Sequence, residues 1–143
     1  MKGKLDVSPG PGINGHVSSF HCLISDDPIV TSAAIFADGE GAECQFLGTV
    51  RGEEDGREIT GIEYSAYQAM AEAELRKLCE RAQSEHGPHR VEIQHRLGFV
   101  PAREPSIVIR VKTKHSGLSF DVCRWYLKEI KTSVPVWKKP VWS

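Results

Sequence analysis

The stretch QAMAEAELRKLCERAQSEH, residues 68–86, is the segment that most strongly decides the fold. Its apolar side chains recur every three or four residues, which is the spacing of one face of an α-helix. Gly87 and Pro88 follow, and this pair ends a helix because glycine closes the last turn and proline cannot continue it. The pattern predicts a helix whose buried residues are Met70, Ala73, Leu75, Leu78, Cys79 and Ala82.

Two stretches with strand character precede this helix. Residues 42–50 carry spaced apolar side chains, and residues 59–67 alternate between polar and apolar side chains as a half-buried strand does. The charged segment between them, residues 51–57, is flanked by glycine and predicts a loop. We therefore expect the two strands to pair through this loop.

The rest of the chain completes an α+β pattern. Residues 90–100 and 106–113 predict two further strands, the second because its side chains are mostly β-branched. Residues 116–132 predict a second helix, and two prolines keep residues 134–142 extended. This order of elements predicts a single α+β domain in which two main helices pack on a mixed or antiparallel sheet.

The N-terminal region divides into a leader and the start of the domain. Residues 1–17 are rich in glycine and proline and show little periodicity, which predicts a flexible leader. Further on, Asp26 and Asp27 precede Pro28 as an N-cap precedes a proline in the first helical turn. This arrangement predicts a short N-terminal helix that ends near Gly39.

Composition limits the class of protein. Of the 143 residues, 40% are hydrophobic, which is enough for one domain, residues 18–143, with its own core. The formal net charge of -1 creates no overall field that would attract nucleic acid or an anionic membrane, so an anionic ligand would need a local cluster of cations. No apolar stretch reaches the roughly 20 residues of a membrane span, and the N-terminus lacks the apolar core of a secretory signal. We expect a cytoplasmic protein.

The four cysteines are spread along the chain without any Cys-x-x-Cys pair. Structural zinc sites usually draw on closely spaced ligand pairs, so this spacing disfavours a metal site. Each cysteine lies in an apolar, periodic segment, which indicates buried free thiols in a reducing compartment. We expect neither a metal nor a cofactor on this chain. The cysteines are Cys22, Cys44, Cys79 and Cys123.

Two lysines near the C-terminus, Lys131 and Lys138, enclose a stiff apolar insert that contains Pro135 and Trp137. An amine that is held in place and partly removed from water has a lowered pKa and can act as a nucleophile or base. This spacing makes both lysines candidate catalytic residues. The alternative is a strand edge that its charges keep soluble.

Two further places combine polar chemistry with the end of a strand. Arg51 has glycines on either side, and its guanidinium suits a phosphate or carboxylate, although it could simply pair with the acidic residues that follow. Lys114, His115 and Ser116 lie where a strand ends and a helix begins, and such a junction offers backbone N–H groups to an anion. In the simpler interpretation, Ser116 or Thr113 only caps the helix and His115 is a surface residue.

Together these motifs resemble the large, catalytic subunit of molybdopterin synthase, the enzyme that makes the dithiolene of the molybdenum cofactor. The resemblance extends from about Phe20 to Lys139. Its most specific part is the segment from Leu127 to Lys139, in which both lysines, the proline and the tryptophan fall at the family's positions. The other motifs that carry it are Phe46-Leu-Gly-Thr-Val-Arg51, Ile62-Glu-Tyr-Ser-Ala-Tyr67, His95-Arg96-Leu-Gly98 and His115.

The resemblance implies a hammerhead-like fold and a sulfurtransferase whose substrate is cyclic pyranopterin monophosphate. Sulfur would arrive on a small, ubiquitin-like carrier subunit that ends in a glycyl thiocarboxylate, and the two proteins would form a heterotetramer around a homodimer of this chain. Lys131 would capture or position the acyl group of the carrier, and Lys138 would act as acid, base or substrate anchor. Arg51 and His115 would hold the phosphate and the pterin, with His115 supplied across the dimer.

Two departures from the family pattern bear on substrate affinity. The family usually has an arginine directly after the histidine, whereas this chain has Ser116, so one phosphate contact is missing or is replaced by Lys114. Many relatives also continue with a charged tail where this sequence ends at Ser143. A second hypothesis is therefore a non-catalytic relative that keeps the dimer and carrier-binding surfaces but has lost pterin binding. A third, an ordinary anion- or nucleotide-binding domain, lacks a glycine-rich phosphate loop of recognised spacing.

Overall fold

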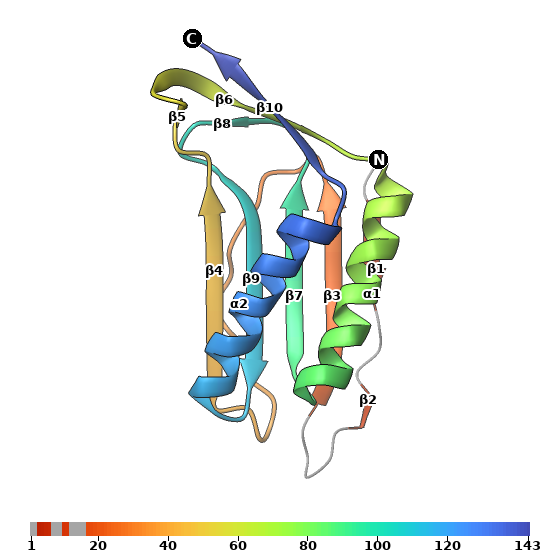
Figure 1. The fold of residues 1–143 in the computed structure, drawn as a ribbon. Helices are drawn as coiled ribbons and strands as arrows, with labels where there is room; N and C mark the ends of the chain where they lie inside the picture. The colour runs from red at the N-terminus through yellow and green to blue at the C-terminus, as the bar shows by residue number, and fades with distance from the viewer. Residues whose placement is uncertain (1–2, 7–9, 12–16) are drawn as a thin grey trace.

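The computed structural model describes residues 3–6, 10–11 and 17–143, which form two sheets and two helices (Figure 1). The elements are β1 (Gly3–Asp6), β2 (Gly10–Pro11), β3 (Val17–Ser25), β4 (Ala42–Thr49), β5 (Glu53–Glu54), β6 (Arg57–Ser65), α1 (Gln68–His86), β7 (Arg90–Arg96), β8 (Gly98–Pro101), β9 (Pro105–Thr113), α2 (Ser116–Ser133) and β10 (Trp137–Trp142). The predicted α+β class is confirmed.

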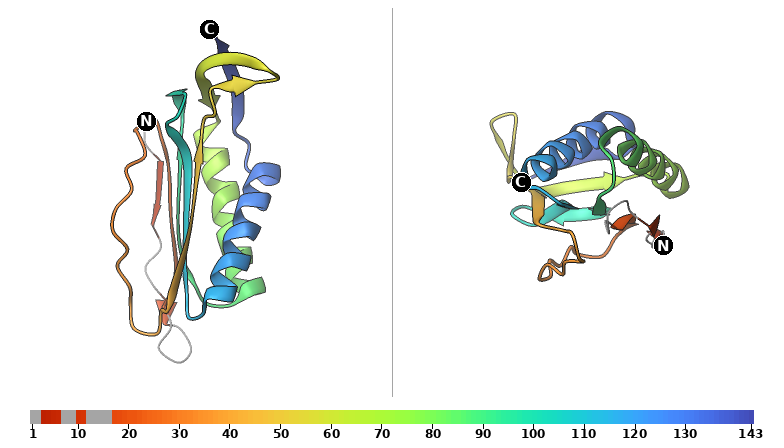
Figure 2. Two further views of the ribbon diagram at one scale, coloured as in Figure 1. Left: turned by 90° about the vertical axis from the view of Figure 1, so that its left-hand side faces the viewer. Right: turned by 90° about the horizontal axis from the view of Figure 1, so that it is seen from below.

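The larger sheet has the strand order β1-β3-β7-β9-β4, with β2 also paired to β3. Strands β3 and β7 are parallel and the other pairs are antiparallel, so the sheet is mixed, as predicted. Both helices cover one of its faces (Figure 2). The smaller sheet, with the order β10-β6-β5 and β8 on β6, crosses one end of the larger one (Figure 1).

The two helices bury their apolar stripes against the larger sheet. Helix α1 has the predicted bounds, and its buried residues are Ala71, Leu75, Leu78, Cys79 and Ala82. Met70 and Ala73 were wrongly expected in this stripe: Met70 is 53% exposed, and Ala73 also faces water. The buried stripe begins at Ala71, and both residues lie to one side of it.

The predicted pairing of residues 42–50 with 59–67 is wrong, because the two strands lie in different sheets. Strand β4 pairs with β9, whereas β6 pairs with β10, β8 and β5. The expected loop at 51–57 instead contains a hairpin in which Glu53 and Glu54 pair with the start of β6. Its two-residue turn is Asp55-Gly56, with φ of 51° and 75°, and a turn with two positive φ angles matches the twist of a hairpin.

The single strand predicted at residues 90–100 is also divided between the sheets. Strand β7 belongs to the larger sheet and β8 to the smaller, with Leu97 between them. Gly98 has a φ of 80°, a backbone angle that glycine adopts readily and that lets the chain change direction. This turn places the end of β7 beside the small sheet.

The predicted helix ending near Gly39 is absent, and residues 26–41 instead form an extended strap across the sheet face opposite the helices (Figure 2). In the strap only Ile29 is buried, while Val30, Ile35 and Phe36 are exposed, so there is no continuous apolar face for a helix to bury. The β-branched run from Ile29 to Thr31 also disfavours a helix.

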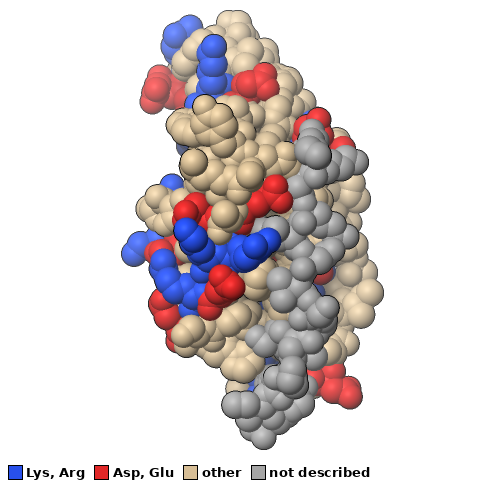
Figure 3. All heavy atoms as spheres, turned by 90° about the vertical axis from the view of Figure 1, so that its right-hand side faces the viewer, with Lys and Arg blue, Asp and Glu red and all other residues tan. Residues whose placement is uncertain are grey.

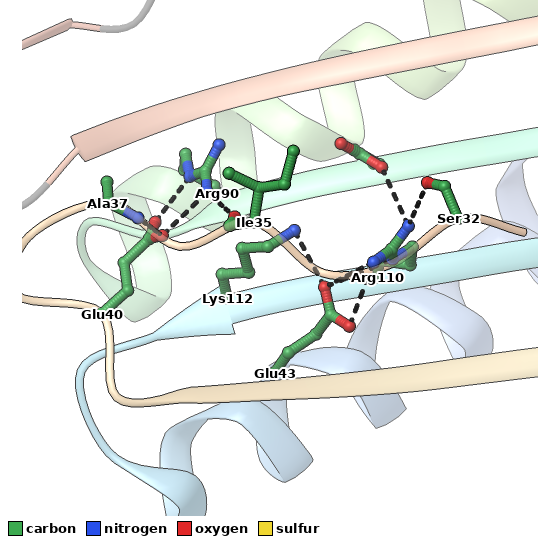
Figure 4. Close-up of polar contacts among 9 residues, drawn as sticks. Ser32, Ile35, Ala37, Glu40, Glu43, Arg90, Arg110 and Lys112 are labelled. Atoms are coloured by element: carbon green, nitrogen blue, oxygen red, sulfur yellow. Dashed lines mark hydrogen bonds and ion pairs between the residues drawn. The ribbon is translucent and has the colours of Figure 1, made fainter.

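Charged side chains of the sheet hold the strap in place (Figure 4). Arg90 donates to the carbonyl oxygen of Ile35 at 2.8 Å, and Arg110 donates to Ser32 Oγ at 3.2 Å. Glu40 accepts from the backbone N–H of Ala37 at 2.7 Å and pairs with Arg90. These contacts satisfy polar groups of a segment that has no regular secondary structure.

The predicted leader, residues 1–17, lies partly outside the described residues. Within it, Gly3–Asp6 pair antiparallel with β3, and Gly10–Pro11 pair with the start of β3. Residues 1–2, 7–9 and 12–16 are not described. The division into a flexible leader and a domain at 18–143 therefore stays a prediction.

Candidate active site

A cavity of about 480 Å³ lies where the end of α2 meets the small sheet and the ends of β7 and β9. Its walls are apolar along α2 and the segment after it, and five polar side chains enter it from different elements. The polar residues are Tyr64, His95, Ser106, Lys131 and Lys138. The apolar residues are Ile107, Leu127, Ile130, Val134 and Val136.

The two candidate catalytic lysines therefore line one cavity, and the local chain path explains why. Lys131 lies in the last turn of α2, and the backbone N–H of Val134 closes that helix by donating to Ile130. The chain then turns and enters β10, where Lys138 pairs with Tyr64 of β6. A helix end, a short turn containing proline and a strand thus bring two amines seven positions apart to the same space.

Arg51 does not line this cavity but a separate hollow with Glu53, Asp55 and Gly56, and Glu54 connects it to Lys138. Its Nη2 lies 3.5 Å from Glu54 Oε2, and Lys138 Nζ lies 3.6 Å from Glu54 Oε1. The arginine and lysine side chains are 78% and 59% exposed, whereas that of Glu54 is only 17% exposed. Glu54 therefore links the candidate anion-binding residue to one of the candidate catalytic residues.

His95 adds a neutral imidazole to the cavity, a role that the sequence did not indicate. Burial lowers its pKa, although a 2.9 Å hydrogen bond from Nδ1 to the carbonyl oxygen of Arg96 partly opposes this. Since Nδ1 donates this bond, Nε2 carries the lone pair. The ring meets Tyr64 edge-on, with centroids 5.2 Å apart. The only signal was a histidine inside a predicted strand, within the family motif.

The remaining three predicted site residues lie at the opposite end of α2. Lys114, His115 and Ser116 are all exposed and mark the N-terminus of this 18-residue helix, which spans about 27 Å. Capping does not explain them, since no side chain caps the helix and the Thr113 hydroxyl donates to the carbonyl oxygen of His115. Within one chain they do not reach the cavity of Lys131.

A second concentration of charge, beneath the strap, has a structural explanation (Figure 4). Lys112 and Arg110 both bind Glu43, with Lys112 Nζ 2.8 Å from Oε1. Burial opposes ionisation of Glu43, but hydrogen bonds from Lys112 and Arg110 outweigh it and lower its pKa. Two cavities of about 230 and 170 Å³ lie here, but the cations that line them are already paired with carboxylates.

The face of the molecule in Figure 3 shows no large patch of a single charge among the described residues. On the side of the molecule shown in Figure 3, basic and acidic side chains lie intermixed. In the described part of the chain, no group of three or more histidine, cysteine, aspartate or glutamate residues could hold a metal ion. No helix among the described residues is long and apolar enough to cross a membrane.

The cysteines are free thiols, and those of Cys22, Cys79 and Cys123 are buried as predicted. Cys44 is only partly buried. Burial raises the pKa of Cys123 to about 12, and the contact with Cys22 at 3.6 Å, together with burial, raises that of Cys79. Thiolates are therefore strongly disfavoured at both positions, and the amines are the better candidates for chemistry.

The fold and cavity define a hammerhead-like α+β protein with an amine-lined site between its two sheets. The model of the MoaE protein family matches residues 24–133. The chain belongs to this family.

Individual relatives agree with this assignment. The chain is 38% identical over 103 residues to a molybdopterin synthase catalytic subunit of Oryza sativa subsp. indica, covering 72% of this chain and 53% of that protein. It is 36% identical over 103 residues to the one of Homo sapiens, covering 72% and 55%. It thus spans little more than half the length of these relatives. The crystal structure of molybdopterin synthase from Staphylococcus aureus aligns with a TM-score of 0.77 at 27% identity, covering 84% of this chain and 90% of that one.

Proposed function

We propose that this chain is the catalytic subunit of a molybdopterin synthase, a sulfurtransferase that acts on cyclic pyranopterin monophosphate. The observation that carries the proposal is the placement of Lys131 and Lys138 on one cavity of about 480 Å³. This volume is in the usual range for a small-molecule site. Its apolar walls suit a flat ring system, and its cations suit a phosphate.

The sulfur donor in this proposal is a small, ubiquitin-like carrier subunit that ends in a glycyl thiocarboxylate. The relatives are named as catalytic subunits, which is consistent with a second component. The thiocarboxylate sulfur bonds to a carbon of the substrate as a bond from that carbon to oxygen breaks, and this oxygen leaves on the phosphate or, protonated, as water. A further water molecule then hydrolyses the acyl carbon–sulfur bond. Sulfur stays on the product, and the carrier leaves with a carboxylate. Two such transfers make a dithiolene, so carrier binding must be reversible.

In this proposal, different residues bind the carrier, transfer protons and hold the phosphate. Lys131, at the mouth formed by the helix end, positions the acyl group of the carrier. Lys138 acts as acid, base or anchor, and Arg51 holds the phosphate beside it. His115, with Lys114 and Ser116, completes the site from a second copy of the chain, because it lies at the other end of α2. This assigns the chain to a homodimer within a heterotetramer. The free thiols fit a cytoplasmic location.

The test is to mix the purified chain with thiocarboxylated carrier and cyclic pyranopterin monophosphate and to assay molybdopterin as its oxidised fluorescent derivative. We expect product with the native chain and none with Lys131→Ala. Lys128→Ala is the matched control, since Lys128 is an exposed lysine of the same helix that does not line the cavity. Binding of the carrier without any product would refute the catalytic assignment, and turnover by Lys131→Ala at the native rate would remove Lys131 from the mechanism.

A further inference from the structure

Glu54 is the one carboxylate that contacts cations of the candidate site in the described part of the chain. Its two oxygens serve two different partners, with Oε1 3.6 Å from Lys138 Nζ and Oε2 3.5 Å from Arg51 Nη2. It is the most buried member of the three, with its side chain 17% exposed. The family resemblance gave this residue no role.

The backbone fixes Glu54 more firmly than a loop would. It is the last residue of β5 and pairs directly with Arg57 across the two-residue turn Asp55-Gly56. A hairpin of this kind sets the register of its strands and hence the face on which each side chain lies. The carboxylate therefore occupies a defined place at one edge of the small sheet, within reach of the Lys138 side chain that extends from β10.

An anion that binds between Arg51 and Lys138 meets this carboxylate at close range. Two charges of the same sign at about 5 Å repel by about 1 kcal/mol even at the dielectric constant of water, and by more where the site is partly desolvated. Glu53 and Asp55 add to this repulsion, because they line a hollow together with Arg51, whereas the guanidinium of Arg57 lies over the Trp142 ring, 4.2 Å from its centroid. An incoming anion must displace the Glu54 carboxylate.

We propose that Glu54 is a specificity-determining residue whose carboxylate occupies, in the unliganded protein, the position between Arg51 and Lys138 that the phosphate of the substrate takes. An intramolecular carboxylate competes at an effective concentration of the order of millimolar or above. A free anion of similar affinity for the two cations displaces it only at a concentration above this effective concentration. A phosphate attached to a ring system that also fills the adjoining cavity displaces it at a lower concentration, because the apolar walls supply additional binding.

This inference rests on the proposed function for the identity of the substrate, but the competition itself can be measured without carrier or turnover. Inorganic phosphate is titrated into the purified chain at low ionic strength and followed by NMR. In Glu54→Gln we expect phosphate to bind three- to tenfold more tightly than in the native chain, since one opposing charge is gone. Glu54→Asp, which keeps the charge but shortens the side chain by one methylene, should fall between the two.

Two further variants separate this explanation from a general change of net charge. Glu63→Gln removes the same charge from the opposite face of β6, beside Lys139, and should change phosphate affinity by less than about twofold. Adding Lys138→Ala to Glu54→Gln should abolish most of the gain, as expected of a coupled pair.

Equal phosphate affinity in Glu54→Gln and the native chain would overturn the proposal, as would an equal gain in Glu63→Gln. If the variants bind phosphate as expected but no molybdopterin is formed, the proposed function is refuted. The conclusion that Glu54 occupies an anion-binding position between Arg51 and Lys138 still holds in that case. In an active protein, Glu54→Gln should lower the KM for substrate.

Discussion

Replacing His89 with glutamine should remove at least about 1 kcal/mol of the stability that the native chain loses between pH 7 and pH 5. His89 is 1% exposed, its Nδ1 donates to the carbonyl oxygen of Gly87 at 2.8 Å, and its Nε2 accepts from the Tyr126 hydroxyl at 2.8 Å. Both ring nitrogens are thus satisfied in the neutral form. Burial lowers the pKa of His89 to about 4, from an ordinary value of 6.5.

The sign and size of the effect follow from linkage between protonation and folding. Between pH 6.5 and about 4 the unfolded chain binds a proton at His89 that the folded chain does not, so the free energy of unfolding decreases as the pH falls. Over the whole window this amounts to about 3 kcal/mol, and from pH 7 to pH 5 to about 2 kcal/mol. Glu40 and Glu43 have pKa values lowered from 4.5, so their contributions to the free energy of unfolding are lost only at a pH more acidic than this window.

Urea unfolding at pH 7 and pH 5 measures this difference for the native chain and for His89→Gln. The comparison uses the change with pH, because the substitution also alters stability at pH 7. We expect the native chain to lose about 2 kcal/mol or more, since His95 acts in the same direction, and His89→Gln to lose at least 1 kcal/mol less. His115→Gln is the control, since this side chain is exposed in the folded chain, unlike that of His89. A His89→Gln variant with the native pH dependence would refute the reasoning.

Three shorter predictions concern the site and its support. Arg51→Ala should raise the KM for substrate about tenfold while leaving the fold intact, and an unchanged KM in steady-state assays would exclude a phosphate contact. Gly61→Ala should destabilise the small sheet by about 1–3 kcal/mol in urea unfolding, because the added Cβ would meet the carbonyl oxygen of Val100, and a neutral result would mean that the strands separate easily. Light scattering at micromolar concentration should show a dimer, and a stable monomer would contradict a site completed by a second copy.

The sequence predicted those parts of the fold that depend on local pattern. Helix α1 was predicted with its observed bounds because its apolar spacing and the Gly87-Pro88 pair are both local signals. The partners of β4 and β6 were not predictable in the same way. The true partner of Phe46 in β4 is Ile109 in β9, more than sixty residues along the chain, and nothing in either strand encodes that distance.

The strap shows how a tertiary contact overrides a local signal. Asp26, Asp27 and Pro28 have the composition of a helix start, yet the segment after them is extended. Arg90 and Arg110, which hold it, belong to strands far along the chain. A capping motif shows only that a helix could begin at that position. The helix forms only if burial of an apolar face stabilises it.

In the candidate site too, residues joined by a short stretch of chain were predicted, and residues brought in by the tertiary fold were not. Lys131 and Lys138 were predicted as a pair because a helix end, a turn and a strand join them over a few residues, and this local path brings both to one cavity. Tyr64 and His95 were not assigned to the site because they enter from β6 and β7, which only the change of sheet at Gly98 brings together. Glu54 was missed because the Asp55-Gly56 turn was interpreted as part of a loop.

The length of α2 limits how His115 and Lys131 can act on one substrate. His115 and Lys131 lie at opposite ends of one rigid helix, about 25 Å apart, so no rearrangement of a single chain that preserves α2 brings them to one substrate. If both act on the same molecule, two copies must be arranged so that the start of α2 in one meets the end of α2 in the other. A two-fold axis produces two such sites at once, because each copy offers both ends. The proposed roles of His115 and Lys131 therefore require a dimer for geometric reasons, independently of how stable each chain is alone.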